Sequence, residues 1–285
     1  MVDYSPTVRV RRLAALLREL RESSGRTASD VARELGWSLT KLTRMEDRRM
    51  RKPQAREVGK LLDVYRVGQE KRAEVMELVR QARDRGWWHN YQDAVDDPYV
   101  TYVGLEAEAV RVQNYEPSTI PGLLQTREYA RALLRARATG LGESLLEERV
   151  ELRMERQKRL LGELDLWAIV TEEMLSRRVG GREVMAAQLE HLLDVAQHGN
   201  VSLQVLPVDA GAAPACGPFV ILRFADDLDP EVVYAETAVG DVYVEKREEV
   251  ESFMLSFERL IAESLAFGDS LALIARRAAE IRRTG

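Results

Sequence analysis

Hydrophobic positions in the first 85 residues recur every three or four residues, which is the spacing of an amphipathic helix. Leu13, Leu17 and Leu20 line one face of a helix predicted over residues 9–24. The same pattern predicts further short helices from Thr27 to Gly36, from Ser38 to about Arg48, from Pro53 through Tyr65 and from about Glu70 to Asp84. Together these segments predict an all-α domain over residues 1–85.

The pattern becomes mixed after residue 100. Alternation of apolar and polar residues predicts strands at residues 164–170, 201–206, 219–224, 232–236 and 242–245, mostly arranged as a meander. Helices are predicted from Tyr102 to about Asn114, after Thr126, and over residues 144–161, 182–198, 248–264 and 270–282. We therefore expect an α+β fold, in which the all-α domain is followed by a larger mixed α/β domain over residues 101–285.

Residues 86–100 interrupt the periodicity and are predicted to link the two domains. Trp87, Trp88, His89 and Tyr91 come first, and a run of aspartates leading to Pro98 follows. Large aromatic side chains are costly to leave in water. We expect these aromatic residues to pack against one of the flanking domains.

The segment from Thr27 to Glu46 has the pattern of a helix-turn-helix. Its first helix needs a small residue for close packing, and its turn needs a residue that tolerates positive φ; Ala32 and Gly36 supply these. A generic helical hairpin also favours Gly and Leu, but it does not need a small residue four positions before the glycine. The scaffold set consists of Val31, Ala32, Leu35, Gly36, Leu42 and Met45.

At these residues the chain resembles the XRE-type family of phage-repressor-like helix-turn-helix proteins. The matching positions are Leu20-Arg21-Glu22, Gly25, Thr27, Val31-Ala32, Leu35-Gly36, Ser38, Leu42 and Met45-Glu46. The resemblance implies a sequence-specific DNA-binding transcription regulator. One position departs from the family, which usually has Gln after the Thr as a phosphate contact. Here that position is Ala28, so this contact is not carried over.

The resemblance extends over nearly the whole chain, to an actinobacterial group in which an XRE-type head precedes a domain of unassigned biochemistry. It is carried by Trp87-Trp88, Tyr102-Val103-Gly104-Leu105-Glu106, Tyr115-Glu116-Pro117, Ile120-Pro121-Gly122-Leu123-Leu124-Gln125-Thr126 and Ser270-Leu271-Ala272-Leu273-Ile274. Members of the group often sit beside genes for very small partner proteins. The resemblance thus implies a regulator whose activity is set through the C-terminal domain by such a partner.

Docking geometry predicts which residues meet DNA. The recognition helix, about Leu39 to Asp47, is expected in the major groove with its N-terminal residues at the base edges. The residues predicted to read bases are Leu39, Thr40, Lys41 and Arg44. The residues predicted to contact phosphates are Thr27, Ser38, Arg48, Arg49, Arg51 and Lys52. The alternative for the basic run after the helix is a solvated loop.

Charge is divided unevenly along the chain. Residues 1–90 hold 21 Lys and Arg against 13 Asp and Glu, whereas the rest holds 21 against 34, although the whole chain carries −5. A basic head on an acidic body is expected where one end meets phosphate. A single head would bind weakly, so we expect a homodimer formed through the acidic body. We also expect a cytoplasmic protein with no membrane segment and no secretion signal.

Chemistry other than DNA binding finds little support in the sequence. His191 and His198 are two helical turns apart, too far for one zinc ion, and Cys216 is isolated, so we expect no metal and no cofactor. Common catalytic motifs are missing, so we do not expect an enzyme. Two alternatives stay open. The body is either an interaction module titrated by a small partner protein, or a ligand sensor with a pocket in the β-region of residues 201–244.

Overall fold

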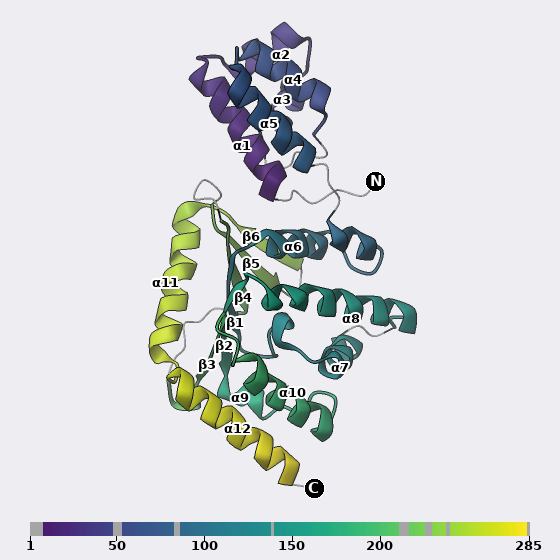
Figure 1. The fold of residues 1–285 in the computed structure, drawn as a ribbon, viewed down its shortest axis with the longest axis vertical. Helices are drawn as coiled ribbons and strands as arrows, with labels where there is room; N and C mark the ends of the chain where they lie inside the picture. The colour runs from purple at the N-terminus through teal and green to yellow at the C-terminus, as the bar shows by residue number, and fades with distance from the viewer. Residues whose placement is uncertain are drawn as a thin grey trace. The chain divides into compact units, whose positions relative to one another are not determined.

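The structure is a computed structural model that describes residues 8–47, 53–82, 86–137, 140–210, 217–225, 230–237 and 240–283. Contacts divide the chain into two compact units, which we describe separately (Figure 1). The first unit, called the head, comprises the described residues up to Gln92 together with Asp96–Leu105. The second unit, called the body, comprises Asp93–Val95 and the described residues from Glu106 onward.

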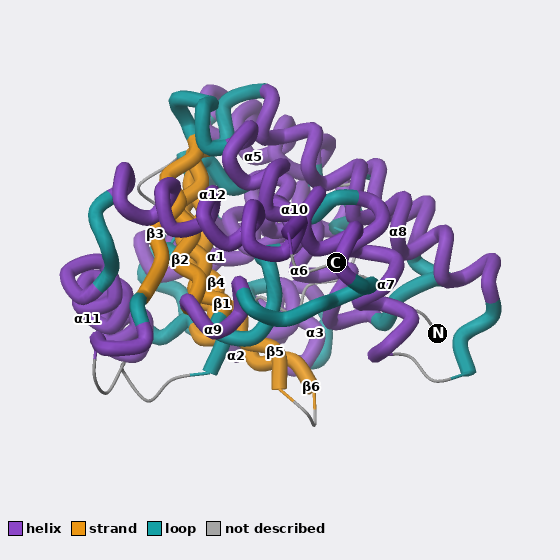
Figure 2. Tube along the Cα trace, turned by 90° about the horizontal axis from the view of Figure 1, so that it is seen from below, coloured by secondary structure: helices purple, strands orange, loops and turns teal. Residues whose placement is uncertain are grey.

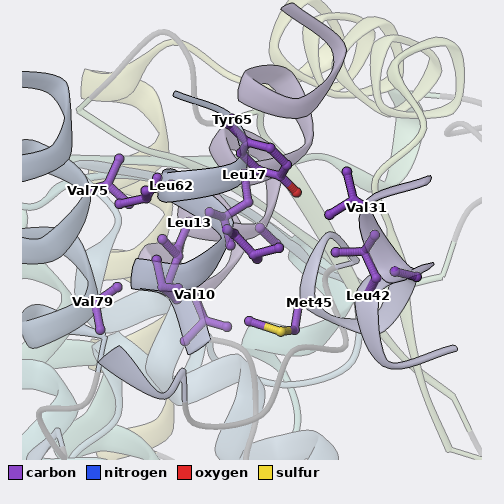
Figure 3. Packing of buried hydrophobic residues seen from close by; sticks show 14 residues of the cluster. Val10, Leu13, Leu17, Val31, Leu42, Met45, Leu62, Tyr65, Val75 and Val79 are labelled. Atoms are coloured by element: carbon purple, nitrogen blue, oxygen red, sulfur yellow. The ribbon is translucent and has the colours of Figure 1, made fainter. Parts of the chain in front are cut away.

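Five α-helices build most of the head. They are α1 (Val8–Ser23), α2 (Ala28–Leu35), α3 (Leu39–Met45), α4 (Ala55–Val64) and α5 (Gln69–Gln81). Their apolar faces meet in one core, in which Leu13, Leu17 and Leu42 are completely buried (Figure 3). Burial of each such side chain contributes about 1.5–3 kcal/mol. The core therefore fixes the short helix α3 against the much longer α1.

The aromatic segment after the head helices forms a short 3₁₀ helix, η1 (Trp87–Tyr91), and α6 (Asp97–Glu108) follows it. Trp88 is only 7% exposed. Its indole lies against two glycines, because a Cβ added at Gly104 would be 3.2 Å from the nearest ring atom and one added at Gly86 would be 2.2 Å from it. Trp88 is thus buried within the head, where close backbone approach requires residues without side chains.

A six-stranded mixed sheet forms the centre of the body. The strands are β1 (Arg111–Glu116), β2 (Asp165–Thr171), β3 (Val201–Leu206), β4 (Phe219–Arg223), β5 (Val232–Thr237) and β6 (Gly240–Val244). Their order is β3-β2-β1-β4-β5-β6, with β3, β2 and β1 parallel and the remaining pairs antiparallel. This confirms the predicted fold class, a helical N-terminal region followed by a mixed α/β domain.

Two expectations about the body were wrong in detail. The helix predicted from Tyr102 to Asn114 ends at Glu108, and Asn114 lies in β1. β1 pairs with β2 on one side and β4 on the other, so tertiary pairing overrides a local apolar spacing that also fits a helix. The meander holds for β4, β5 and β6 only, because β3 lies at the opposite edge, parallel to β2.

Helices cover both faces of the sheet. They are α7 (Arg127–Arg137), α8 (Glu143–Gln157), α9 (Glu172–Leu175), α10 (Arg182–Val195), α11 (Arg247–Glu263) and α12 (Phe267–Arg283), with 3₁₀ turns η2 (Gly122–Leu124), η3 (Lys158–Leu161) and η4 (Val208–Ala210). Figures 1 and 2 show α11 on one face and α7, α8 and α10 on the other. Phe257 of α11 packs with Tyr115, Ile169 and Phe219 of the sheet.

The start of α12, together with the connection between α11 and α12, covers Val205 on the outer edge of β3. The N–H of Leu265 donates to the Val205 carbonyl at 2.9 Å, and the Ser270 hydroxyl accepts from the Val205 N–H at 3.0 Å. The Gln204 side chain adds a bond to the Leu265 carbonyl at 2.9 Å. Ser270 is completely buried. One short segment thus satisfies both backbone groups that Val205 turns away from the sheet.

We expect Ser270→Ala to lower the free energy of unfolding of the body by about 1–3 kcal/mol, because it leaves the Val205 N–H buried and unpaired. Urea denaturation measures the change. Ser252→Ala is the matched control, because the Ser252 hydroxyl bonds to Glu248 on an exposed part of α11. That variant should stay within about 0.5 kcal/mol of the parent. Equal losses from the two variants would contradict the role given to Ser270.

Candidate nucleic-acid interface

Local capping fixes the turn between α2 and α3. Gly36 has a φ of 65°, in the left-handed region that favours glycine, and its N–H bonds back to Ala32 and Arg33. The Trp37 N–H also donates to the Ala32 carbonyl, at 2.8 Å. The Ser38 hydroxyl then accepts the Lys41 N–H at 3.2 Å and begins α3. The chain therefore reverses over three residues between the two helices.

The predicted scaffold residues lie where the two helices meet the core of the head. Val31, Ala32, Leu42 and Met45 are buried, and Leu35 packs against the same cluster from a partly exposed position. Ala32 is 3% exposed and belongs to the same buried cluster as Leu42 of α3. A larger side chain at Ala32 would have to push the helices apart.

The opposite side of α3 faces solvent. Leu39 is 48% exposed, and Thr40, Thr43 and Arg44 are exposed as well. Thr43 is a residue that the sequence prediction omitted. Its hydroxyl donates to the backbone carbonyl of Leu39 at 3.0 Å, so the hydroxyl is held against the backbone of α3. In the described part of the chain, Arg44 has no hydrogen-bond or ion-pair partner, so its five donors are available to a ligand.

Lys41 differs from the other residues that were predicted to read bases. It is half-buried, and its Nζ is 2.5 Å from Glu57 Oε1 in the first turn of α4. The same ammonium lies 4.3 Å from the centroid of a Trp37 ring. The structure therefore directs this cation toward the protein, whereas Arg44 points into solvent.

The hydroxyls of Thr27 and Ser38, which were both predicted to contact phosphate, differ in their hydrogen bonds. The Thr27 hydroxyl accepts the Asp30 N–H and donates to the Asp30 carboxylate at 2.6 Å, a bond that lowers the pKa of Asp30. The Ser38 hydroxyl only accepts, and the described residues offer it no acceptor. Ser38 can therefore still donate a hydrogen bond to a phosphate, whereas the Thr27 proton is already used. Arg48, Arg49, Arg51 and Lys52 lie outside the described residues.

A buried ion pair fixes the C-terminal end of α3. The Arg21 Nε is 2.9 Å from both carboxylate oxygens of Glu46, the residue that caps α3, and Tyr65 at the end of α4 donates to Glu46 at 3.0 Å. The Arg21 and Glu46 side chains are 12% and 5% exposed. Burial, together with the Glu46 carboxylate, raises the pKa of Tyr65, so its hydroxyl remains a donor. Three helices are thereby joined at one point.

The sequence contained a signal for this pair. Arg21 follows Leu17 by four residues on α1, and Glu46 follows Leu42 by four residues. Both charges therefore lie on apolar helix faces, where they are costly unless they are paired.

We expect Glu46→Gln to destabilise the head by about 3 kcal/mol, because the buried Arg21 guanidinium loses its counter-charge. Amide hydrogen exchange across α3 and α4 measures the loss. Glu74→Gln removes a carboxylate that pairs with Lys71 on α5 but is 53% exposed, and it should cost less than about 1 kcal/mol. Similar protection in both variants would show that the Glu46 pair does not stabilise α3.

Both the head and the body match known protein families. A profile described as Helix-turn-helix domain matches residues 12–75. A second profile, described as Domain of unknown function (DUF5753), matches residues 99–276, more than half of the chain. The chain belongs to the DUF5753 family. A search of curated proteins and a search of solved structures found no match.

The profile match identifies residues 12–75 of the head as a helix-turn-helix domain, and such a domain indicates DNA binding. The DUF5753 domain carries no assigned activity. Its described residues hold no group of three or more His, Cys, Asp or Glu side chains that could bind a metal ion. Among the helices that the structure describes, none combines the length and apolar character needed to cross a membrane.

The segment Pro121–Thr126 is a buried element of the DUF5753 domain. Gln157 donates to the carbonyls of Gly122 and Gln125 at 2.9 and 2.7 Å. Gln188 accepts the Thr126 N–H and donates to the Leu124 carbonyl, both at 2.7 Å. Gln125 itself is 1% exposed. These glutamines replace water at an irregular backbone segment inside the core, so the segment holds the body together and leaves little surface for a ligand.

A second buried ion pair in the DUF5753 domain joins α6 to α8. Arg156 forms two bonds of 2.7 Å to the Glu106 carboxylate, and both side chains are less than 5% exposed. Arg159 donates to the carbonyls of Glu106 and Ala109 where α6 ends. Within the body, Glu106 and Ala109 are therefore held by one side chain of α8 and one of η3.

Glu116, at the carboxyl end of β1, is a partly buried acid whose charge the fold disfavours. Burial raises its pKa to about 7, and the Thr119 hydroxyl, which donates at 3.0 Å, opposes that shift. The ordinary value is 4.5. A carboxyl with a raised pKa contributes stability that is present below its unfolded pKa and is lost as pH rises toward the folded value. This loss therefore falls between about pH 4.5 and 7.

We expect Glu116→Gln to gain stability over the parent as pH rises from about 5 to 8, by up to about 3 kcal/mol. Urea denaturation at a series of pH values measures the difference. Thr119→Val removes the hydroxyl that lowers the pKa of Glu116. The loss of stability with rising pH should therefore occur at a higher pH in this variant than in the parent. A constant difference between Glu116→Gln and the parent across this range would contradict the burial of the carboxylate.

Proposed function

We propose that this protein is a sequence-specific DNA-binding transcription regulator. The observation that carries the proposal is the exposed face of α3, formed by Leu39, Thr40, Thr43 and Arg44, on a helix that is fixed at both ends. A rigid helix with an unpaired arginine and outward apolar groups suits the edges of base pairs. The basic balance of the first 90 residues supports the same proposal.

In this proposal α3 lies in the major groove, as in other helix-turn-helix proteins. Arg44 donates both arms of its guanidinium to guanine O6 and N7, and Leu39 packs against a thymine methyl group. Ser38 donates its free hydroxyl proton to a phosphate. The basic residues after α3, which were predicted to contact phosphates, belong to the proposal on sequence grounds alone.

The body is proposed to supply dimerisation and control. Two heads on a two-fold operator would double the contact area of one short helix. The resemblance to the XRE-type actinobacterial group supports regulation by a small partner protein that binds the acidic body. We propose that the protein acts in the cytoplasm and is not an enzyme. Light scattering measures the mass of the protein in solution, and a mass equal to that of one chain would overturn the proposed dimer. A body that binds no small protein encoded beside its own gene would overturn the proposed partner.

We expect Arg44→Ala to weaken binding to the preferred operator by about 1–3 kcal/mol and to relax preference at one base pair. Selection from random duplexes identifies the operator, and fluorescence anisotropy measures the affinities. Arg80→Ala is the matched control, because Arg80 is an exposed arginine of α5, which packs on α1 and α4. It should leave base preference unchanged. An Arg44→Ala protein with the parent's operator preference would sink the assignment, and a parent that selects no sequence would sink the proposed function.

A further inference from the structure

The two cations of α3 lie on the same flank of the helix but have different surroundings. Lys41 precedes the buried Leu42, and Arg44 precedes the buried Met45, so the two side chains lie one turn apart on one side of α3. Arg44 is exposed, whereas the Lys41 side chain is 35% exposed. Their different exposure follows from what surrounds Lys41, and not from its position on the helix.

Two partners from separate elements hold the Lys41 ammonium. Glu57 Oε1 approaches Nζ to 2.5 Å from the first turn of α4, and the Glu57 side chain is 26% exposed. Trp37, in the turn before α3, places a ring centroid 4.3 Å from the same nitrogen. A partly buried pair is screened less by salt than an exposed one, and the indole adds a second attraction to the cation.

The pair of Lys41 and Glu57 carries no net charge. Affinity for DNA of any sequence comes mostly from cations that neutralise phosphates and release counterions. A lysine held by a carboxylate does not contribute to this electrostatic part of the affinity unless its ion pair breaks. This flank of α3 therefore presents one unpaired cation to DNA, although the sequence offers two.

We propose that Glu57 holds Lys41 away from DNA phosphates and so lowers the affinity of the head for every duplex by a common factor. This inference rests on the proposed DNA-binding function. Glu57 is then a positioning residue of the interface, and Lys41 is neither a base-reading residue nor a phosphate contact in the parent protein. A common factor leaves the ratio of operator affinity to nonspecific affinity unchanged, so the pair affects how tightly the head binds DNA and not which sequence it selects.

Binding of the full-length chain to a short duplex of random sequence, measured over a range of salt concentrations, tests the inference. Glu57→Gln frees Lys41, so its slope of log affinity against log salt should be steeper than that of the parent by about 0.9, the value for one phosphate contact. The double variant K41M/E57Q replaces one neutral pair by another. Its slope should equal that of the parent. Thermal melts of each variant show that the head remains folded.

Each other outcome overturns the inference. A double variant with a slope shallower by about 0.9 would mean that Lys41 already contacts a phosphate in the parent. Glu57→Gln with the parent's slope would mean that Glu57 does not restrain Lys41. Equal gains from Glu57→Gln and the double variant would mean that the carboxylate acts by repelling DNA directly. A parent that fails to bind duplex DNA at any salt concentration would instead remove the proposed function itself.

Discussion

The arrangement of the head depends on the buried pair between Arg21 and Glu46. α3 has only seven residues, and a helix this short is not stable by itself. Its N-terminal end is capped by the Ser38 side chain. Its C-terminal end is capped by the backbone N–H of Glu46, whose side chain is held by a charge from α1 and a hydroxyl from α4. Because the pair is nearly inaccessible to water, it requires correct geometry in all three helices at once. The orientation of the exposed face of α3 follows from that requirement.

Features that depend on neighbouring residues could be predicted from the sequence. The turn at Gly36, the cap at Ser38 and the buried positions Leu42 and Met45 follow from local rules of backbone geometry and periodicity. Contacts between distant segments could not be predicted in the same way. Glu57 lies 16 residues after Lys41, and the pattern of apolar residues contains nothing that brings the two together. The sequence therefore indicated the exposed face correctly as a region but did not separate Lys41 from Arg44.

The body shows the same division between local and distant effects. Amphipathic helices such as α10 were predicted closely, because their apolar residues repeat at helical spacing. β1 was taken for the end of a helix, because only its pairing with β2 and β4 distinguishes the two conformations. The glutamines Gln125, Gln157 and Gln188 gave no signal, since most of their partners are backbone groups of an irregular segment. Their role in the DUF5753 domain became visible only with the hydrogen bonds.

The closure of β3 by Leu265 and Ser270 affects how the chain behaves when it is incomplete. Until the start of α12 and the segment before it are in place, β3 presents an edge on which the backbone groups of Val205 are unpaired. Such an edge is a template on which a strand from another molecule can add, which leads to aggregation. A chain shortened before Leu265, by proteolysis or interrupted synthesis, would lose the packing of α12 on α10 and would expose that template. The last helix of the body therefore protects against self-association of partly folded molecules as well as adding to the core.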